Sequence, residues 1–278
     1  MVWNLSFKSA TVPNDWKIAN VTQIFKKGSR GDPGNYRLVS LTSVPGKLVE
    51  TIVKNKIVRH IEEHKLLRRS QHGLCKGRSC LTNLLEFFEG VNKHVDKADP
   101  VDIVYLDFQK AFDKVSHQRL LCKLSCHGIR GKILSYIENW LKDREQRVGI
   151  NGKFSEWRVV TSGVPQGSVL GPILFNLLIN DLETGVNSEV AKFAYDTKLL
   201  KIVKTKGDCD ELEKDLTKLS DWATKWQMKF NVDKCKVMHI GKNNPNYIYC
   251  DGARPDGYRK VVGDRYINSR LNKSLVPG

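Results

Sequence analysis

Two strand-like runs on either side of a tight turn constrain this chain most. Two runs rich in apolar residues, 189–194 and 197–203, predict two strands. The tetrapeptide Phe193–Asp196 contains the turn that joins them. Val101–Asp107 is a third run of this kind, and it ends in a carboxylate where a turn begins. A single tetrapeptide like this one is most often an ordinary hairpin turn. Its weight therefore depends on the rest of the chain.

A loop punctuated by glycine and proline adds a second constraint. Ser162–Pro172 leads into an apolar stretch, Ile173–Leu182, that predicts a helix. Phosphoryl transfer by two metal ions needs carboxylates from separate segments, which converge on cations about 3.5–4 Å apart. Asp107 and the turn at 195–196 are candidates for such a pair of segments.

The charge of the chain indicates the class of partner. Its 278 residues suffice for one large domain or two small ones. With 46 Lys and Arg against 30 Asp and Glu, the net charge is +16, which favours a polyanionic partner. Ribosomal, chromatin and membrane-surface proteins share such an excess, so charge alone makes nucleic acid only the default expectation.

The seven cysteines include no C-x-x-C pair, and an odd number fits a disulfide framework poorly. We interpret them as reduced thiols of an intracellular protein, nuclear or cytoplasmic. The first residues lack the pattern of a secretory signal, and no stretch reaches the ~18 apolar residues of a membrane span. The sequence therefore predicts a soluble chain without a membrane partner.

Helical and strand-like segments alternate irregularly, which favours an α+β fold over a doubly wound sheet. Residues 1–45 read as loop-rich with a few short strands, and 246–278 as a poorly structured tail. The other predicted elements are helices over 46–66, 81–97, 117–126, 131–142 and 208–226, and strands over 101–107, 146–150, 157–161, 189–194, 197–203 and 235–240.

Short motifs follow one another along the chain in a fixed order: Asp15–Val21, Phe25–Gly28, Asn35–Ser43, Gln71–Leu74, Gly77–Cys80 and Lys234–Val237. Together with the segments above, they resemble the reverse transcriptase domain of non-LTR retrotransposons, most closely the CR1/jockey-like LINE elements. The resemblance runs from Val12 to Pro245. It implies a right-hand polymerase with fingers over 1–100 and a palm over 101–245, followed by the divergent segment 246–278, with the thumb missing or unrecognisable.

The same resemblance implies roles for particular residues. Asp107 would be the first catalytic metal ligand, and Tyr195 and Asp196 stand where the family carries two aspartates. The implied substrate contacts are Phe112 at the sugar 2′ position, Gln166 near nucleotide and template, Arg37 and Arg78 on template or triphosphate, and Lys234 at the pyrophosphate leaving group.

Each of these residues also has a simpler interpretation. Asp107 would otherwise cap a turn, Phe112 would belong to the core, and Arg37 and Arg78 would be surface charges. His60–His64 fits the H-x-x-E-H pattern of a zinc protease. It lies in a Lys- and Glu-rich helical stretch without a third ligand, so we assign it no zinc.

Tyr195 is the decisive departure from the family pattern. A phenol with a pKa near 10 does not supply an anionic oxygen at neutral pH. Hard Mg²⁺ is held by one or two carboxylates plus substrate phosphates, so the loss of a shared ligand should impair the site. Leu38, in place of a proline, and Leu74, in place of a phenylalanine, are milder departures.

The resemblance thus implies an RNA-directed DNA polymerase that uses Mg²⁺, an RNA template, a DNA primer and deoxynucleoside triphosphates. Tyr195 predicts that its catalysis is impaired or lost, as in a degenerate fragment of an element. The alternative is a remnant that binds nucleic acid without chemistry, and a zinc protease ranks far below both. The oligomeric state and the template preference stay open.

Overall fold

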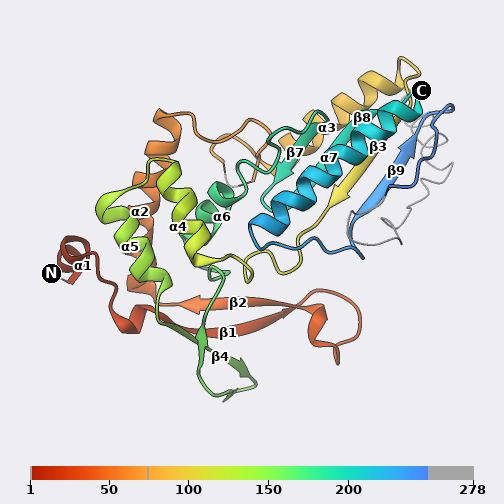
Figure 1. Cartoon of the computed structure of the whole chain (residues 1–278). Helices are drawn as coiled ribbons and strands as arrows, with labels where there is room; N and C mark the ends of the chain where they lie inside the picture. Colours follow the sequence, from red (N-terminus) through yellow and green to blue (C-terminus); the bar gives the residue numbers. More distant parts are fainter. Residues whose placement is uncertain (1, 74, 250–278) are drawn as a thin grey trace, which may run out of the picture. The chain divides into compact units, whose positions relative to one another are not determined.

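The computed structural model describes residues 2–73 and 75–249. Helices and strands are mixed, which confirms the predicted α+β class (Figure 1). They form two compact units, each built from two stretches of chain. Unit 1 comprises the residues up to Arg68 with Lys110–Asn180, and unit 2 comprises Arg69–Gln109 with the residues from Asp181 onward. These units do not follow the fingers–palm boundary expected near residue 100, and that assignment stays a prediction.

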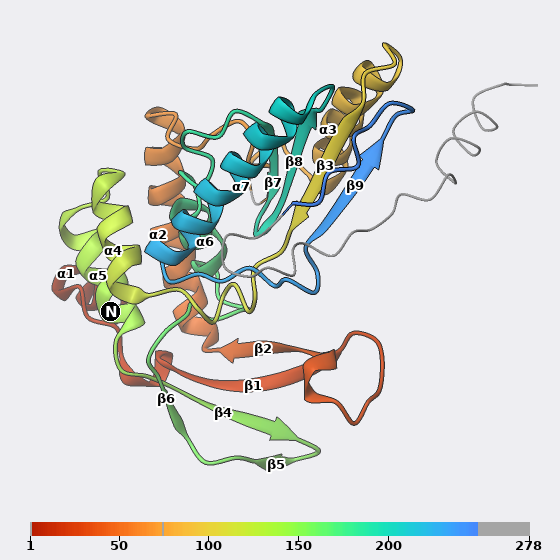
Figure 2. The ribbon, with the colours of Figure 1, turned by 45° about the vertical axis from the view of Figure 1, so that its right-hand side comes forward.

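Unit 1 contains a five-stranded sheet, in the order β2-β1-β4-β5 with β6 on β4. The strand β1 forms an antiparallel hairpin with β2 and pairs in parallel with β4 (Figure 2). Both hairpin strands are longer than the short strands predicted for residues 1–45. The strands are β1 Ile18–Phe25, β2 Tyr36–Thr42, β4 Arg144–Ile150, β5 Lys153–Phe154 and β6 Arg158–Val160.

The helices of unit 1 bury their apolar residues against one another. In α6, every residue except Pro172 is buried, as expected of a helix that is apolar on all sides. The short α1 lies in a stretch that the sequence predicts to be loop, and Phe7 stacks on Tyr136 of α5. The helices are α1 Val2–Ser9, α2 Val44–Glu63, α4 His117–Cys126, α5 Gly131–Leu141 and α6 Gly171–Leu178.

Unit 2 is built on an antiparallel sheet in the order β7-β8-β3-β9. The central strand β3 is buried on both faces, because α3 and α7 cover opposite sides of the sheet (Figures 1 and 2). Val101 and Ile103 of β3 pack with Phe87 and Val91 of α3. The elements are α3 Cys80–Val95, β3 Val101–Leu106, β7 Glu189–Phe193, β8 Asp196–Ile202, α7 Lys206–Lys225 and β9 Lys236–Ile240.

The structure extends four residues into the segment predicted to be unstructured. Tyr249 is 1 % exposed, and its hydroxyl donates to Oδ2 of the buried Asp102 at 2.5 Å. Residues 246–249 form no helix or strand, and this contact nevertheless anchors Tyr249. Residues 250–278 and Leu74 lie outside the described part of the chain, as does Cys250.

The state of the cysteines and the presence of membrane-spanning helices can both be examined within the described residues. The six cysteines among them are all free thiols, as predicted. Within residues 2–73 and 75–249, the helices are all too short or too polar to cross a membrane.

Candidate metal centre

Two aspartates lie at the ends of neighbouring strands in unit 2. The strands β3 and β8 pair in antiparallel register, and the last pair is Leu106 with Thr197. Asp107 and Asp196 each come one residue beyond this pair, so the register brings them opposite one another. The segment that ends in Asp107 and the one that begins at Asp196 are thus adjacent antiparallel strands. Carboxylates from two separate segments are thus presented at one end of the sheet.

The charges of the two aspartates interact. Partial burial raises the pKa of Asp196, and the neighbouring Asp107 carboxylate raises it further. The ammonium groups of Lys234 and Lys198 act in the opposite direction. A pair of like charges that repel in this way is the arrangement that a bound cation stabilises.

Lys234 supplies a positive charge to the same place. Its Nζ lies 2.5 Å from Oδ2 of Asp107, and this hydrogen bond raises the pKa of the lysine. The negative charges of Asp107 and Asp196 contribute to the same shift. Backbone hydrogen bonds hold the segment in place, because Asn231 donates its N–H to the carbonyl of Asp107 and accepts that of Lys234.

The donor set fits a magnesium ion only in part. Two carboxylates from adjacent strand ends suit Mg²⁺, which takes its other ligands from water and substrate phosphates. Among the described residues, however, the structure contains no group of three or more His, Cys, Asp and Glu side chains arranged to hold a metal. Tyr195 is half-buried in the turn, and its place as a substituted metal ligand stays a prediction.

The raised pKa of Asp196 predicts how the stability of the fold depends on pH. Because its folded-state pKa is raised, the folded protein loses stability relative to the unfolded chain as the pH rises through that pKa. Without divalent metal, Asp196→Asn should therefore raise the melting temperature at pH 7 by on the order of 1 °C. The difference should shrink as the pH is lowered to about 4, because the wild-type carboxyl takes up protons at a higher pH than an ordinary aspartate.

Thermal melts at both pH values measure this effect. Asp221→Asn, at an exposed position of α7, serves as the control and should leave the melting temperature unchanged at both pH values. A lower melting temperature for Asp196→Asn at pH 7 would contradict the assigned repulsion.

Three of the predicted substrate contacts lie in unit 1. Phe112 is half-buried and stacks on Phe175 of α6, with ring centroids 5.1 Å apart. Gln166 lies in the loop before α6, and its carbonyl accepts the N–H of Ser40 at 2.7 Å. Arg37 is exposed on β2. Their contacts with template and nucleotide stay predictions.

Arg78, in unit 2, has a structural role that the sequence did not predict. Its guanidinium donates to the backbone carbonyls of Arg69 and Gln71, the latter at 2.6 Å. The side chain thereby fastens the loop that precedes α3. Arg78 is partly exposed, so these contacts are compatible with a surface charge, and its contact with substrate stays a prediction.

The histidines of the H-x-x-E-H motif are used within the fold. His60 Nε2 lies 2.8 Å from the carbonyl of His127, and His64 Nδ1 lies 2.9 Å from the carbonyl of His60. These contacts, at the carboxyl end of α2, account for both imidazoles without zinc.

Two residues that support the predicted site were not assigned roles from the sequence. Glu50 is 2 % exposed in α2, and it accepts the N–H groups of Val169 and Leu170 just before α6. The buried Gln71 contacts Ala194 in the turn. The sequence contains a sign of each role. Glu50 is a carboxylate at an otherwise apolar position of a predicted helix, and Gln71 belongs to the Gln71–Leu74 motif.

The comparisons with known proteins agree with this geometry. Residues 24–264 match the family described as reverse transcriptase (RNA-dependent DNA polymerase). The probable RNA-directed DNA polymerase from transposon BS of Drosophila melanogaster is 29% identical over 84% of this chain and 27% of its own length. The RNA-directed DNA polymerase from mobile element jockey of the same organism is 27% identical over 99% of this chain and 31% of its own length. The chain thus spans less than a third of the length of these relatives.

Solved structures support the fold independently. Telomerase from Candida tropicalis, truncated from its C-terminal domain, superposes with a TM-score of 0.59 at 14% identity, over 88% of this chain and 55% of the telomerase chain. At this identity, the likeness concerns the fold alone. The family match covers most of the chain, and the relatives above are polymerases of non-LTR mobile elements. The chain therefore belongs to the reverse transcriptase family, as a domain of the LINE retrotransposon type.

Proposed function

We propose that this chain is an RNA-directed DNA polymerase domain that works by two-metal nucleotidyl transfer and is impaired by Tyr195. The observation that carries the proposal is the convergence of Asp107, Asp196 and Lys234 at one end of the β3–β8 pair. Reverse transcriptases normally use divalent metal ions. Asp107 and Asp196 are the residues that would hold them here.

Each residue contributes a distinct part of the proposed reaction. Bound Mg²⁺ would polarise the attacking primer oxygen and neutralise charge on the leaving oxygen. Once the ammonium of Lys234 has left Asp107, it would pair with the pyrophosphate, because a compact cation suits a phosphate. In unit 1, Phe112 would screen the sugar and Gln166 would contact nucleotide and template. Proton removal from the primer oxygen would fall to the solvent or to a carboxylate of the site.

Two features weaken this arrangement: Tyr195, and the ion pair of Lys234 with Asp107. The neutral phenol adds no negative charge, so a divalent cation gains less electrostatic stabilisation than three carboxylates would give. In addition, Lys234 bonds Asp107 directly and competes with a metal for that carboxylate. We therefore expect primer extension on a primed RNA template with Mg²⁺ to be weak or undetectable for this chain.

The proposed partners are an RNA template, a DNA primer and deoxynucleoside triphosphates. Two observations support nucleic acid as the partner. The first is the net charge of +16. The second is that a structurally similar protein, the telomerase of Candida tropicalis (TM-score 0.58), was solved in complex with a fragment of telomeric RNA. A second candidate function is binding without chemistry. The ion pair between Lys234 and Asp107 favours it, because it satisfies a metal-binding carboxylate without a metal.

Binding to primed RNA should weaken steeply as salt rises, since each neutralised phosphate releases counterions. Arg37→Ala should weaken binding severalfold and reduce the slope of log K against log salt by about 1, with an unchanged melting temperature. Binding titrations at several salt concentrations measure both quantities. Arg59→Ala, exposed on α2 of the same unit, is the matched control for charge. Equal losses for both variants would show that Arg37 acts only through net charge.

A further inference from the structure

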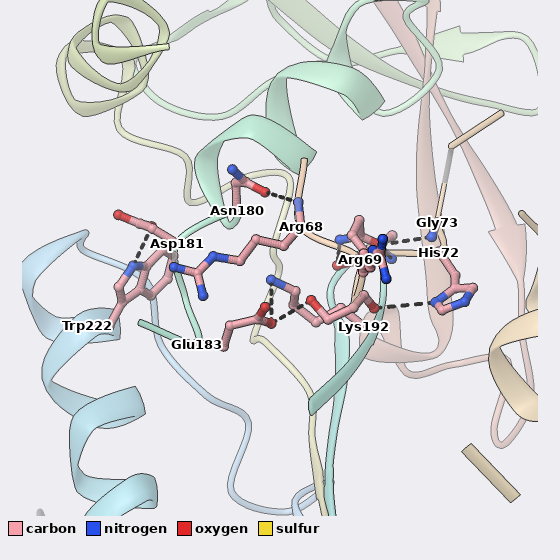
Figure 3. Close-up of polar contacts among 12 residues, drawn as sticks. Arg68, Arg69, His72, Gly73, Asn180, Asp181, Glu183, Lys192 and Trp222 are labelled. Atoms are coloured by element: carbon pink, nitrogen blue, oxygen red, sulfur yellow. Dashed lines mark hydrogen bonds and ion pairs between the residues drawn. The ribbon is translucent and has the colours of Figure 1, made fainter. Parts of the chain in front are cut away.

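The segment just before α3 lies along the strand that leads into the turn. The N–H of Lys192 donates to the carbonyl of Ser70 at 2.7 Å, and the N–H of His72 donates to the carbonyl of Lys192 at 2.8 Å (Figure 3). Gln71 and Lys192 thus form a parallel bridge. The residues 70–73 therefore extend the sheet of unit 2 beside β7.

The side chain of Gln71 continues this pairing beyond the end of β7. Its Oε1 accepts the N–H of Ala194 at 2.9 Å and that of Gly73 at 2.8 Å, while its Nε2 donates to the carbonyl of Ala194 at 3.3 Å. The carboxamide thereby occupies both backbone groups of Ala194. Because Gln71 is 1 % exposed, water does not readily replace these bonds.

Ala194 needs such support because of its backbone conformation. It is the first of two residues between Phe193 and Asp196, and its φ of +54° lies in the left-handed region that disfavours a side chain. Gly73 packs directly against it, since a Cβ at position 73 would lie 2.2 Å from the backbone nitrogen of Ala194. The turn is thus held by a glycine that allows close approach and by a glutamine that bonds its backbone.

Polar side chains hold the supporting segment itself. Lys192, which is fully buried, pairs with Glu183 at 3.0 Å, and Ser70 donates to the same carboxylate at 2.6 Å (Figure 3). His72 Nε2 lies 2.9 Å from a carboxylate oxygen of Glu86 in α3. Residues 70–73 are therefore fastened on both sides of Gln71 and do not rely on that side chain to stay in place.

We infer that Gln71 is a positioning residue, which clamps the backbone of Ala194 so that Tyr195 and Asp196 are held at the end of the strand pair that carries Asp107. It is too far inside the fold to touch a substrate, and it acts through the turn alone. The inference rests on the proposed function for its catalytic meaning, whereas its structural part does not. It also gives a physical role to Gln71 and Gly73 of the Gln71–Leu74 motif.

Amide hydrogen exchange of the turn tests whether Gln71 holds the backbone of Ala194, in chains that keep Tyr195. Gln71→Met keeps the length of the buried side chain. It removes the amide group that donates a hydrogen bond to Ala194 and accepts one from it. It should speed exchange in a peptide containing Ala194 by about tenfold. Gln71→Glu retains the acceptor oxygen and should speed exchange only about threefold. Gln118→Met, exposed on α4, is the matched control and should change nothing.

The exchange of α7 separates positioning from general stability. In both Gln71 variants, peptides from Lys206–Lys225 should exchange as in the wild type. An unchanged turn in Gln71→Met, or a turn and α7 that accelerate together, would overturn the inference. If Gln71→Met does not fold, Gln71→Glu decides by the same comparison.

Binding of Mn²⁺ tests the catalytic meaning. In a Tyr195→Asp background, Gln71→Met should weaken Mn²⁺ affinity about tenfold, measured by the relaxation of water protons, and Gln71→Glu should weaken it less. Unchanged affinity would overturn the positioning role. If the exchange results hold while Tyr195→Asp shows no polymerase activity, the proposed function fails and the clamp stands.

Discussion

Replacing Tyr195 with aspartate is expected to raise Mg²⁺-dependent nucleotide incorporation on a primed RNA template by about a hundredfold or more. The new carboxylate would stand in the turn beside Asp196, which lies opposite Asp107, and would give the site three anionic side chains. Metal ions stabilise the transition state of such reactions by several kcal/mol, and each 1.36 kcal/mol corresponds to a tenfold change in rate. The expected gain therefore exceeds that of any other single substitution in this site.

Two further variants make the test specific. Tyr195→Asn has the size of the aspartate without its charge, so it should leave incorporation at the wild-type level. Adding Asp107→Ala to Tyr195→Asp should abolish the restored activity, because it removes the carboxylate on the opposite strand. A Tyr195→Asp protein that is folded, binds primed RNA and adds no nucleotide would show that Tyr195 is not what limits this chain.

Glu50→Ala is expected to produce the largest loss of stability. In unit 1, the Glu50 carboxylate accepts the indole N–H of Trp140 at 3.0 Å and the backbone N–H groups of Val169 and Leu170 at 2.7 and 3.2 Å. Burial lowers the pKa of the neighbouring Arg144 to about 10, and the Glu50 charge opposes this shift. The substitution would leave buried donors without an acceptor and would remove a negative charge that favours the charged form of the buried Arg144.

Breaking a buried charged network in this way costs about 3–5 kcal/mol, which corresponds to a melting temperature lower by on the order of 10 °C. Glu50→Gln, which keeps one acceptor oxygen, should lie between the variant and the wild type. Glu63→Ala, exposed on the same helix, is the control and should cost less than about 0.5 kcal/mol. A Glu50→Ala protein within 1 kcal/mol of the wild type in urea unfolding would contradict this account.

The Glu50 network also concerns the proposed site. Val169 and Leu170 follow Gln166 in the loop before α6, and Ser168 accepts the N–H of Gly171 at 3.0 Å. The amides that begin α6 are thus bonded by side chains from α2 and from the loop itself. Loss of Glu50 should therefore loosen the loop that carries Gln166 as well as lower stability.

Most of the regular elements were predictable from local patterns, and the misses have identifiable causes. The run Val101–Leu106 forms β3 as predicted, because its continuous apolar character suits a central strand covered on both faces. The helix α1 was missed because eight residues carry a weak periodic signal, and stacking of Phe7 on Tyr136 supplies the missing stabilisation. The anchoring of Tyr249 was not predicted because it depends on Asp102, far away in the chain.

The sequence by itself determined the strands, the carboxylates at their ends and the family pattern, because alternation, turns and motif order are properties of neighbouring residues. Only the tertiary structure decided which distant groups support the site. Glu50 meets Val169 across 119 positions, and Gln71 meets Ala194 across 123. Such contacts depend on how the elements pack, since a buried polar group bonds whichever partner the fold brings within reach. The turn that carries Asp196 was therefore predictable from the sequence, whereas the side chains that hold it in place were not.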